Sequence, residues 1–414
     1  MTDAYKGSGS HTFGRRRPIL SGKYPVTLEP KRDTHFRALP DPTGDPPFHL
    51  ALENILEPED FKAIVDAKRL TFHVNGDMGG IKYAVPQELV AKGMEKSFDA
   101  GADQSVNPAF LYITGDCVYY NGEVAQYYSQ FYEPYEFYPR PIFAVPGNHD
   151  GENLPTGNTL DGFVRNFCAP EADKLPESQD SHRTAMVQPN VYWTLTTPLL
   201  NIVGLYSNVP AGGEVKEPQR SWFVNELKTL PKDVPLFVTL HHPPYSADDH
   251  HSGSLHMKKL IDDAAQQAGR FPDMVIAGHV HDYQRLTQEF SDGRQVPFLV
   301  TGAGGYHNLH HVMKVDHQAM ITPVLMHKDD DSMITLEAYV DDHHGFLILS
   351  VTPELITGHY YQVPRPQEPY SKGNQLTDHF EFDWKKGRYR INDLSGSAPK
   401  VGTVARGRGR ARHH

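Results

Sequence analysis

The sequence predicts an α/β fold, in which buried strands alternate with helices and end in polar motifs. Short apolar runs bounded by glycine recur along the chain, as buried strands do, and amphipathic stretches of helical period separate them. Motifs rich in aspartate, asparagine and histidine follow these runs directly. Open α/β folds bind ligands in the crevice outside the carboxyl ends of their strands, so the motifs predict a functional site at that edge.

Length and composition narrow the possible classes of protein. A chain of 414 residues could hold one large α/β domain or two small ones. The net charge of −11 argues against nucleic-acid binding by the protein as a whole, and no apolar run approaches the length of a membrane helix. Two cysteines, Cys117 and Cys168, cannot form a disulfide framework. The 24 histidines are many beside 40 lysines and arginines, and they require an explanation.

The N-terminal residues indicate a cytoplasmic protein. Arg15, Arg16 and Arg17 are followed by Pro18 rather than by the apolar segment of a signal peptide, and the sequence contains no N-glycosylation motif. We therefore expect a cytoplasmic location, with export as the open alternative. The sequence indicates no oligomeric state.

We expect three regions along the chain. Residues 1–50, rich in Gly, Ser, Pro and Arg, predict an extended and partly disordered arm. Residues 51–365 predict the folded domain, and residues 366–414 predict a polar extension. That extension ends in the Arg-Gly tail 406–412, which we interpret as a solvated tail; contact with RNA or an anionic surface is the alternative.

In the first half of the domain, the sequence predicts helices over 58–68 and 86–100 and strands over 70–75, 109–114 and 141–145. The tract 119–138 holds seven tyrosines and predicts a helix that packs through aromatic rings. The second half predicts helices and strands in the following order: paired strands 191–196 and 200–206, helix 220–230, strand 234–240, helix 255–268, strand 274–277, and largely antiparallel strands 298–301, 333–340 and 345–351.

Five predicted strands end in residues that can bind metal ions. These residues are Asp77, Asp116, Asn148, His241 and the pair His279 and His281. Oxygen and imidazole ligands without a thiolate suit Mn, Fe or Zn at a catalytic site. With Tyr119 added, the ligands suffice for two metals that share one carboxylate. Two metals about 3.5–4 Å apart can clamp both oxygens of an in-line displacement at phosphorus.

The motifs that carry these residues also match a known family. They are Gly76-Asp77-Met78-Gly79, Gly115-Asp116-Cys117-Val118-Tyr119, Gly147-Asn148-His149-Asp150, His241-His242-Pro243 and Gly278-His279-Val280-His281. In this order they resemble the five blocks G-D-x-G, G-D-x-x-Y, G-N-H-[ED], H-x-P and G-H-x-H of the calcineurin-like metallophosphoesterases, and specifically of the purple acid phosphatases. The resemblance covers roughly residues 70–352.

The resemblance implies a four-layer α/β/β/α sandwich of two mixed sheets with a dinuclear metal centre. It implies Fe(III) in one position and Fe(II), Zn(II) or Mn(II) in the other. Asp77, Asp116, Tyr119 and His281 would hold the first metal, and Asp116, Asn148, His241 and His279 would hold the second, with Asp116 bridging. It further implies substrate contacts by His149, His250 and His251.

Two positions decide the subfamily. Most relatives carry a metal-binding histidine where this chain has Gly79, and Tyr119 as a phenolate would fill that vacancy. A phenol of reference pKa ~10 ionises near neutrality only beside a hard, highly charged cation, so this interpretation implies ferric iron. The alternative is that Tyr119 stands there by chance, because the local sequence is rich in tyrosine.

The implied function is acid phosphatase-like hydrolysis of a small phosphate monoester by a metal-bound hydroxide. His149 or His250 would protonate the leaving alkoxide. The alternative is a metallophosphodiesterase acting on nucleotides or phospholipid head groups. A non-catalytic protein that retains the scaffold would lack metal ligands, and none of the motif ligands is missing. Nothing in the sequence argues specifically for a phosphoprotein phosphatase.

Other residues near the motifs have simpler interpretations. We interpret His242 as a hydrogen-bonded core histidine and Cys117 as a small buried residue. His250 and His251 lie in a polar loop and could instead be surface residues. Asp150 could orient His149 or lie on the surface. The histidine cluster over 307–317 follows a glycine-rich turn, and we favour a structural role over a position at the site's rim.

Overall fold

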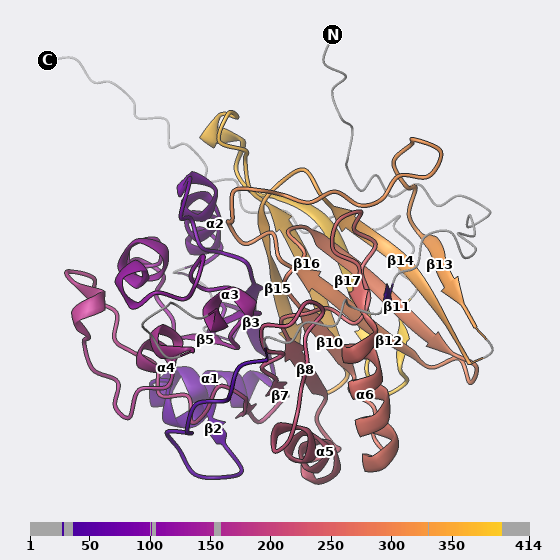
Figure 1. Cartoon of the computed structure of the whole chain (residues 1–414), viewed down its shortest axis with the longest axis horizontal. Coiled ribbons are helices and arrows are strands. Elements are labelled where there is room, and N and C mark those ends of the chain that lie inside the picture. The colour runs from indigo at the N-terminus through magenta and orange to yellow at the C-terminus, as the bar shows by residue number, and fades with distance from the viewer. Residues whose placement is uncertain are drawn as a thin grey trace, which may run out of the picture.

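Two mixed β-sheets form the centre of the structure, as predicted (Figure 1). The computed structural model describes residues 27–28, 36–99, 101, 105–152, 159–329 and 331–390. The nine-stranded sheet contains, in spatial order, β13 (Val324–Lys328), β14 (Ser332–Val340), β11 (Tyr283–Phe290), β12 (Gln295–Thr301), β10 (Met274–Ala277), β8 (Leu236–Leu240), β7 (Asn201–Gly204), β6 (Trp193–Thr196) and β2 (His49–Ala51).

The second sheet has seven strands, and a small pairing lies apart from both sheets. The seven strands are, in order, β18 (Arg388–Tyr389), β17 (Gln375–Asp383), β16 (Leu355–Gln362), β15 (Gly345–Val351), β3 (Leu70–Asn75), β4 (Leu111–Ile113) and β5 (Ile142–Ala144). The small pairing joins β1 (Thr27–Leu28) to β9 (Gly253–Ser254). The helices are α1 (Pro58–Ala67), α2 (Val85–Glu95), α3 (Asn148–Gly151), α4 (Asp161–Phe167), α5 (Gln219–Thr229) and α6 (Leu255–Ala268).

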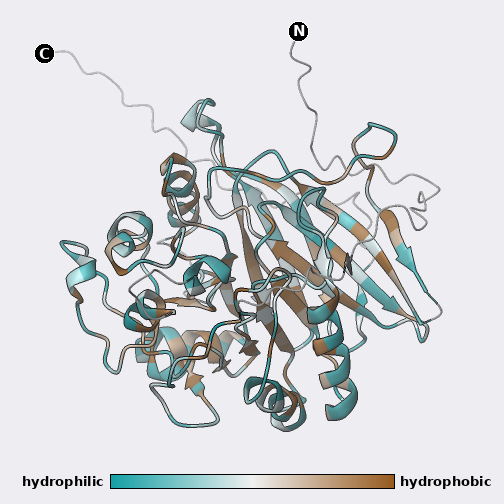
Figure 2. Ribbon diagram, viewed as in Figure 1, coloured by the Kyte–Doolittle hydropathy of each residue, from teal (hydrophilic) through white to brown (hydrophobic). Residues whose placement is uncertain are grey.

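Alternation along the central strands builds the layers. In β8, Phe237 belongs to the core that includes the seven-stranded sheet, whereas Val238 belongs to a second core with Phe223 of α5 and Ile261 of α6. Successive side chains of a strand point to opposite faces, so both faces of the nine-stranded sheet are covered. Figure 2 accordingly shows mostly apolar strands at the centre of the molecule. The outer helices carry their polar faces toward solvent.

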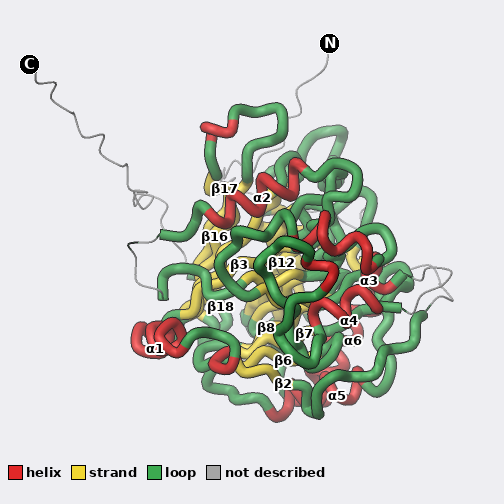
Figure 3. The backbone as a smooth tube through the Cα atoms, turned by 90° about the vertical axis from the view of Figure 1, so that its left-hand side faces the viewer, coloured by secondary structure: helices red, strands yellow, loops and turns green. Residues whose placement is uncertain are grey.

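Within each sheet, the strands that carry the motifs run parallel to one another. β3, β4 and β5 are parallel to one another in the seven-stranded sheet, and β7, β8, β10 and β12 are parallel in the nine-stranded sheet. The backbone N–H of Gly76 donates to the carbonyl of Thr301 at 2.9 Å, which joins the carboxyl ends of β3 and β12. Figure 3 shows the loops gathered in front of the labelled strands β3, β8 and β12. The carboxyl edges of both sheets therefore meet in one region.

One predicted element is wrong. The tract 119–138 forms no α-helix but a short 3₁₀ turn at Val124–Gln126, a π-helical turn at Tyr128–Tyr132 and further turns. Gly122 has a left-handed backbone (φ 59°) and Pro134 lacks an N–H donor, so neither favours a continuous α-helix. The aromatic packing was predicted correctly, because Tyr127, Tyr132, Tyr135 and Tyr138 are all buried.

The expected domain limits at residues 50 and 365 also need correction. β2 begins at His49, inside the expected arm, and pairs with β6. β17 and β18 extend the seven-stranded sheet well beyond residue 365. The folded domain therefore includes residues on both sides of the expected limits. The expected Arg-Gly tail 406–412 lies outside the described residues. Among the described residues, no helix combines the length and the apolar character needed to cross a bilayer; a cytoplasmic location stays a prediction.

Candidate metal centre

The predicted metal-binding residues lie directly after five parallel strands. Asp77 follows β3, Asp116 follows β4, Asn148 follows β5, His241 follows β8, and His279 and His281 follow β10. Backbone hydrogen bonds join these ends, from Gly278 N–H to the His241 carbonyl at 3.0 Å and from Asp77 N–H to the Gly115 carbonyl at 3.0 Å. Because parallel strands in both sheets end at one edge, residues as far as 204 positions apart along the chain, Asp77 and His281, converge there.

Three of these residues have unusual backbone conformations. Asp77, Asp116 and His279 have φ values of 55°, 53° and 69°, in the left-handed region that side chains other than glycine rarely adopt. Such residues cluster at functional sites, where the surrounding structure holds them. Here the left-handed residue turns the chain sharply at the strand end, so that its side chain faces the other sheet instead of continuing along the strand.

Glycine in the motifs permits close approach of the carboxylates. A Cβ on Gly147 would lie 2.0 Å from Oδ1 of Asp116, and a Cβ on Gly278 would lie 2.6 Å from Oδ2 of Asp77. No other residue type could stand at either position without displacing a carboxylate. These glycines therefore explain why the motifs pair glycine with a neighbouring ligand residue.

One group of side chains gathers around Asp77. The Tyr119 hydroxyl lies 3.3 Å from Asp77 Oδ1 and 3.4 Å from His281 Nε2, and His281 Nε2 lies 3.5 Å from Asp77 Oδ1. His281 Nδ1 lies 2.8 Å from the carbonyl of Asn308. A protonated Nδ1 donates to that carbonyl, which leaves Nε2 with its lone pair toward Asp77 and Tyr119.

A second group gathers around Asn148. His241 Nε2 lies 3.0 Å from Asn148 Oδ1 and 3.3 Å from Asp116 Oδ2, and His279 Nδ1 lies 3.1 Å from Asn148 Oδ1. His241 Nδ1 lies 3.0 Å from the Thr114 carbonyl, so a proton on Nδ1 again leaves Nε2 free for a cation. The resemblance allots these residues to the second metal, and the structure brings them together as one group.

Asp77, Asp116 and His241 connect the two groups. One ligand atom from each lies within 4.8 Å of the others, and all three residues are buried. The two carboxylates contact backbone N–H groups, histidines and Tyr119, and no lysine or arginine pairs with either carboxylate among the described residues. Buried charges are normally paired or bound to metal, so this donor set fits cations.

Mutual charge interactions shape the protonation of the group. Burial opposes ionisation of Asp116, yet His241 and His149 hold its pKa well below the ordinary value. Burial likewise opposes the cationic form of His241, but Asp116 and Asp77 raise its pKa to about 9. The pKa of His279 falls well below its usual value because of burial and the neighbouring His242 and His241 rings. In the absence of metal, a proton on His241 therefore partly compensates the carboxylates.

Tyr119, which belongs to the group around Asp77, is fully buried. Its ring stacks on Tyr306 with centroids 4.2 Å apart, and its backbone N–H and carbonyl both bind the side-chain amide of Gln130, at 3.0 and 2.8 Å. Burial first, and the charges of Asp116 and Asp77 second, raise its pKa well above the ordinary phenol value. Only a highly charged cation in contact with the oxygen could reverse that shift and make the residue a phenolate.

The predicted substrate-contacting histidines take different positions. His149 is half-buried, its N–H donates to Asp116 Oδ1 at 2.9 Å, and its Nδ1 lies 2.8 Å from the Tyr120 carbonyl. His251 is also half-buried, with its ring 4.7 Å from that of His279. His250 is exposed, and its ring lies 4.8 Å from the ring of His251.

Asp150 was interpreted incorrectly as a partner of His149 or a surface acid. It is buried, and its carboxylate accepts the N–H groups of Gly147, Cys117 and Val118 at 2.8, 3.1 and 3.1 Å. Burial and the charge of Asp116 raise its pKa to about 7. Asp150 thus ties the loop after β4 to the loop after β5. Cys117 is a small buried residue, as predicted.

His242 is buried, as predicted, and the 307–317 cluster supplies one residue that sequence reasoning did not single out. His242 Nδ1 lies 2.8 Å from Ser207 Oγ, and its ring lies 4.4 Å from that of His279. His310 is buried and stacks on His281 with centroids 4.3 Å apart, while its Nδ1 lies 3.4 Å from Asp248. The preference for a structural role therefore describes His310 incompletely, because it packs directly on a predicted ligand.

Comparisons with known proteins agree with this geometry. The family model described as "Calcineurin-like phosphoesterase" matches residues 70–283, just over half of the 414 residues. "Probable purple acid phosphatase 20" of Arabidopsis thaliana is 28% identical over 162 residues, which cover 37% of this chain and 34% of that protein. "Purple acid phosphatase 21" of the same plant is 28% identical over 174 residues, 40% of this chain and 36% of that protein.

A solved structure shows the same fold. The purple acid phosphatase isolated from yellow lupin (Lupinus luteus) seeds superposes with a TM-score of 0.53 at 15% identity, covering 76% of this chain and 54% of that chain. The alignments with the two Arabidopsis proteins span about a third of each protein's length. The five strand-end motifs, their convergence at one edge and the family match lead to one conclusion: this chain belongs to the calcineurin-like phosphoesterase family.

Proposed function

We propose that this protein is a dinuclear-metal phosphoesterase, and specifically a phosphomonoesterase of the purple acid phosphatase type. The observation that carries the proposal is the pair of buried carboxylates, Asp77 and Asp116, between two groups of imidazole, amide and phenol ligands. Because no lysine or arginine pairs with them among the described residues, cations are the fitting counter-charge.

Asp77, Asp116, Tyr119 and His281 would hold the first metal, and Asp116, Asn148, His241 and His279 would hold the second. When bound, such a pair of cations supplies Lewis acidity, which polarises the phosphoryl group and makes water acidic enough to attack it near neutral pH. We propose Fe(III) for the first position because of Tyr119, and Fe(II), Zn(II) or Mn(II) for the second. A small-molecule phosphate ester is the proposed substrate.

His149 is the proposed proton donor to the leaving alkoxide. Its Nδ1 faces the Tyr120 carbonyl at 2.8 Å, so a hydrogen on Nδ1 is held there and Nε2 is the nitrogen left for substrate. Nε2 can give a proton only while the ring carries both hydrogens. His149 would therefore donate from Nε2 while Nδ1–H stays bonded to the Tyr120 carbonyl.

His251 and His250 would also contact the phosphate. Burial, followed by the charges of His310 and His250, lowers the pKa of His251 to about 4. His251 would therefore bind phosphate through a neutral ring at pH 7, as a hydrogen-bonding partner. Asp248 accepts the backbone N–H groups of His250 and His251 at 3.1 and 2.6 Å and so fixes this loop.

The test compares Asp116→Asn with wild type after metal quantification, using 4-nitrophenyl phosphate and its bis-ester. We expect more than about 100-fold loss of turnover in Asp116→Asn, since the shared carboxylate is replaced by an amide. The exposed Asp66→Asn variant on α1 serves as the charge-matched control and should keep wild-type rates. Near-normal turnover by a metal-loaded Asp116→Asn protein would contradict the proposal, and preference for the bis-ester would replace it with a phosphodiesterase.

A further inference from the structure

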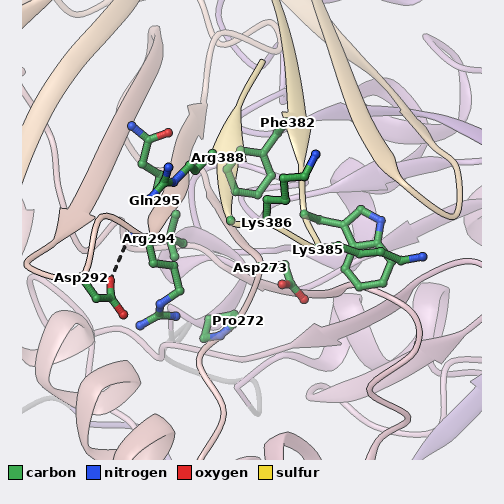
Figure 4. Close-up of a pocket in the computed structure, with 12 residues that line it drawn as sticks. Pro272, Asp273, Asp292, Arg294, Gln295, Phe382, Lys385, Lys386 and Arg388 are labelled. Atoms are coloured by element: carbon green, nitrogen blue, oxygen red, sulfur yellow. Dashed lines mark hydrogen bonds between the residues drawn. The ribbon is translucent and has the colours of Figure 1, made fainter. Parts of the chain in front are cut away.

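A hollow, drawn in Figure 4, lies where β10 and β12 of the nine-stranded sheet begin, whereas the metal centre lies where they end. Its volume is about 430 Å³, and three segments line it: 272–273 before β10, 292–296 at the turn from β11 to β12, and 382–388 around the turn from β17 to β18. β10 and β12, of 4 and 7 residues, begin near this hollow and end near the metal centre. At about 3.3 Å per residue, roughly 13–23 Å separates the two sites.

The walls of the hollow are held by both sheets. The Gln295 backbone N–H donates to the Gly387 carbonyl at 2.7 Å, and the Tyr389 backbone N–H donates to Gln295 Oε1 at 3.0 Å. The Trp384 indole N–H donates to the Thr352 carbonyl at 3.3 Å. These bonds connect the β11–β12 turn to the β17–β18 hairpin, so the hollow is formed before any ligand arrives.

Cationic side chains dominate the lining. Arg294, Lys385, Lys386 and Arg388 come from two hairpins, against the two carboxylates Asp273 and Asp292 (Figure 4). This local excess of positive charge is opposite in sign to the net charge of −11 of the whole chain. An anion would therefore be attracted to this hollow in preference to most of the surface.

The carboxylates of the lining have other partners. Asp273 Oδ2 accepts the Leu236 backbone N–H at 2.8 Å, and burial raises the pKa of Asp273 to about 6 against the opposing charges of Arg270 and Arg294. Asp292 Oδ1 accepts the backbone N–H of Arg294 at 2.8 Å. Lys386 pairs with Asp383 at 3.0 Å, but in the part of the chain that the structure describes no carboxylate pairs with Arg294, Lys385 or Arg388.

The two guanidinium groups are free to bind a ligand. The Arg294 guanidinium lies 4.2 Å from the Phe290 ring centroid and 5.2 Å from that of Phe271, so aromatic faces hold its plane. Within the described residues, neither Arg294 nor Arg388 donates a side-chain hydrogen bond to a protein group. A planar guanidinium with open N–H donors matches the paired oxygens of a phosphate.

We propose that this hollow binds a phosphate-bearing small molecule at a site separate from the metal centre. The two arginines would bind the phosphate oxygens, and Lys385 and Lys386 would add charge at the rim. Phe382 and Trp384 supply an apolar wall, and the volume exceeds that of a bare phosphate, so an organic phosphate ester also fits. Free phosphate and a phosphate ester share the same chemistry, and the experiment distinguishes them.

The test is calorimetric titration of the full-length, metal-loaded protein with inorganic phosphate and with phenylphosphonate, an ester analogue that cannot be hydrolysed. We expect two classes of site in the wild type. The variant Arg294→Gln/Arg388→Gln should weaken one class at least tenfold and leave the other unchanged. A control variant, Arg69→Gln/Lys228→Gln, removes two exposed charges outside the hollow and should keep both classes.

Tryptophan fluorescence gives a second readout, because Trp384 lines the hollow. A saturable change in emission should follow the weakened class and disappear in Trp384→Phe. If the arginine variant fails to fold, the exposed pair Lys385→Gln/Lys386→Gln should still weaken that class at least threefold. Tighter binding of phenylphosphonate would identify an ester as the ligand, and equal or tighter binding of phosphate would identify the free anion.

Three results would overturn the proposal. They are a single class of site in the wild type that Arg294→Gln/Arg388→Gln leaves unchanged, survival of both classes in that variant, and equal weakening in the control variant. None of these results bears on the proposed metal centre, since the lining of the hollow contains no predicted metal ligand. Failure of this proposal and failure of the phosphoesterase proposal can therefore be told apart.

Discussion

The ring of Tyr119 occupies the space into which a side chain at residue 79 would extend. A Cβ placed on Gly79 would lie 2.7 Å from Cδ2 of Tyr119 and 2.4 Å from Oε1 of Gln130. In this structure a histidine at residue 79 and the observed position of Tyr119 thus exclude each other. The missing histidine and the present tyrosine are therefore one feature of the site, which argues against the interpretation that Tyr119 stands there by chance.

Tyr119→Phe should remove the colour of the iron-loaded protein. A phenolate bound to ferric iron gives a broad visible charge-transfer band, and phenylalanine has no oxygen to supply it. The measurement is an absorption spectrum beside a metal analysis, with the buried Tyr127→Phe as the control that keeps the band. A wild-type protein that is colourless with two divalent metals would leave the phosphoesterase core intact but remove the ferric assignment.

Gly79→Ala should destabilise the protein by about 2–4 kcal/mol. The added methyl group displaces Gln130, which costs up to two hydrogen bonds to the Tyr119 backbone, and it overpacks the ring. Urea unfolding measures the change. Gly101→Ala is the matched control, because its nearest contact would lie at 3.4 Å, and it should change stability by less than about 0.5 kcal/mol. Equal unfolding midpoints for the two variants would refute the packing argument.

The motif-bearing strands could be predicted because their sequence signals are local. β10 at Met274–Ala277 is a continuous apolar run, β3 at Leu70–Asn75 alternates apolar with polar residues, and glycine follows both; their predicted limits are those observed. The residues after them could be predicted as one site, since parallel strands deliver their carboxyl ends to one edge. The separation into two ligand groups required the family resemblance, because spacing along the chain does not give distances across two sheets.

The missed strands have weaker signals. β16 buries only alternate residues such as Ile356, Gly358 and Tyr360, and the intervening side chains are partly exposed. β17 likewise reads as polar, although Phe380 and Phe382 face the core. The stacking of His310 on His281 could not be predicted from sequence, because tertiary packing alone positions the loop that follows the glycine-rich turn.

His73 should make the metal-free protein sensitive to acid. It is fully buried on β3, with Nδ1 2.8 Å from the Tyr138 hydroxyl and Nε2 2.9 Å from Ser97 Oγ, and burial lowers its pKa to about 3. Below pH 6.5 the unfolded chain, with a histidine pKa near 6.5, therefore binds a proton that the folded protein does not bind. The stability that His73 contributes is fully present above pH 6.5 and is lost as pH falls toward 3, at about 1.4 kcal/mol per pH unit.

The measurement compares His73→Gln with wild type in urea unfolding between pH 7.5 and 4.5, with EDTA present to exclude metal release. We expect the pH slope of the unfolding free energy to be smaller in His73→Gln by about 1.4 kcal/mol per unit. His256→Gln, which changes an exposed histidine on α6, should keep the wild-type slope. Parallel slopes in His73→Gln and wild type would show that His73 is protonated without cost in the fold.

Asp378→Leu should cost about 3–5 kcal/mol and should show that residues beyond 365 belong to the domain. Asp378 on β17 accepts two hydrogen bonds from Arg285 on β11, at 2.7 and 2.9 Å, and a third from the Tyr283 hydroxyl at 2.8 Å. Both charged residues are buried, so removing the carboxylate leaves the Arg285 guanidinium buried without its counter-charge. Urea unfolding of the full-length protein measures the loss.

The double variant Arg285→Met/Asp378→Leu separates charge from packing. Because it removes both charges and keeps apolar volume, it should unfold at a higher urea concentration than Asp378→Leu alone. Because the pair joins β11 of one sheet to β17 of the other, the same comparison tests what couples the two sheets. If both variants lost the same stability, the cost would come from packing, and the buried pair would not be what couples β17 to the rest of the fold.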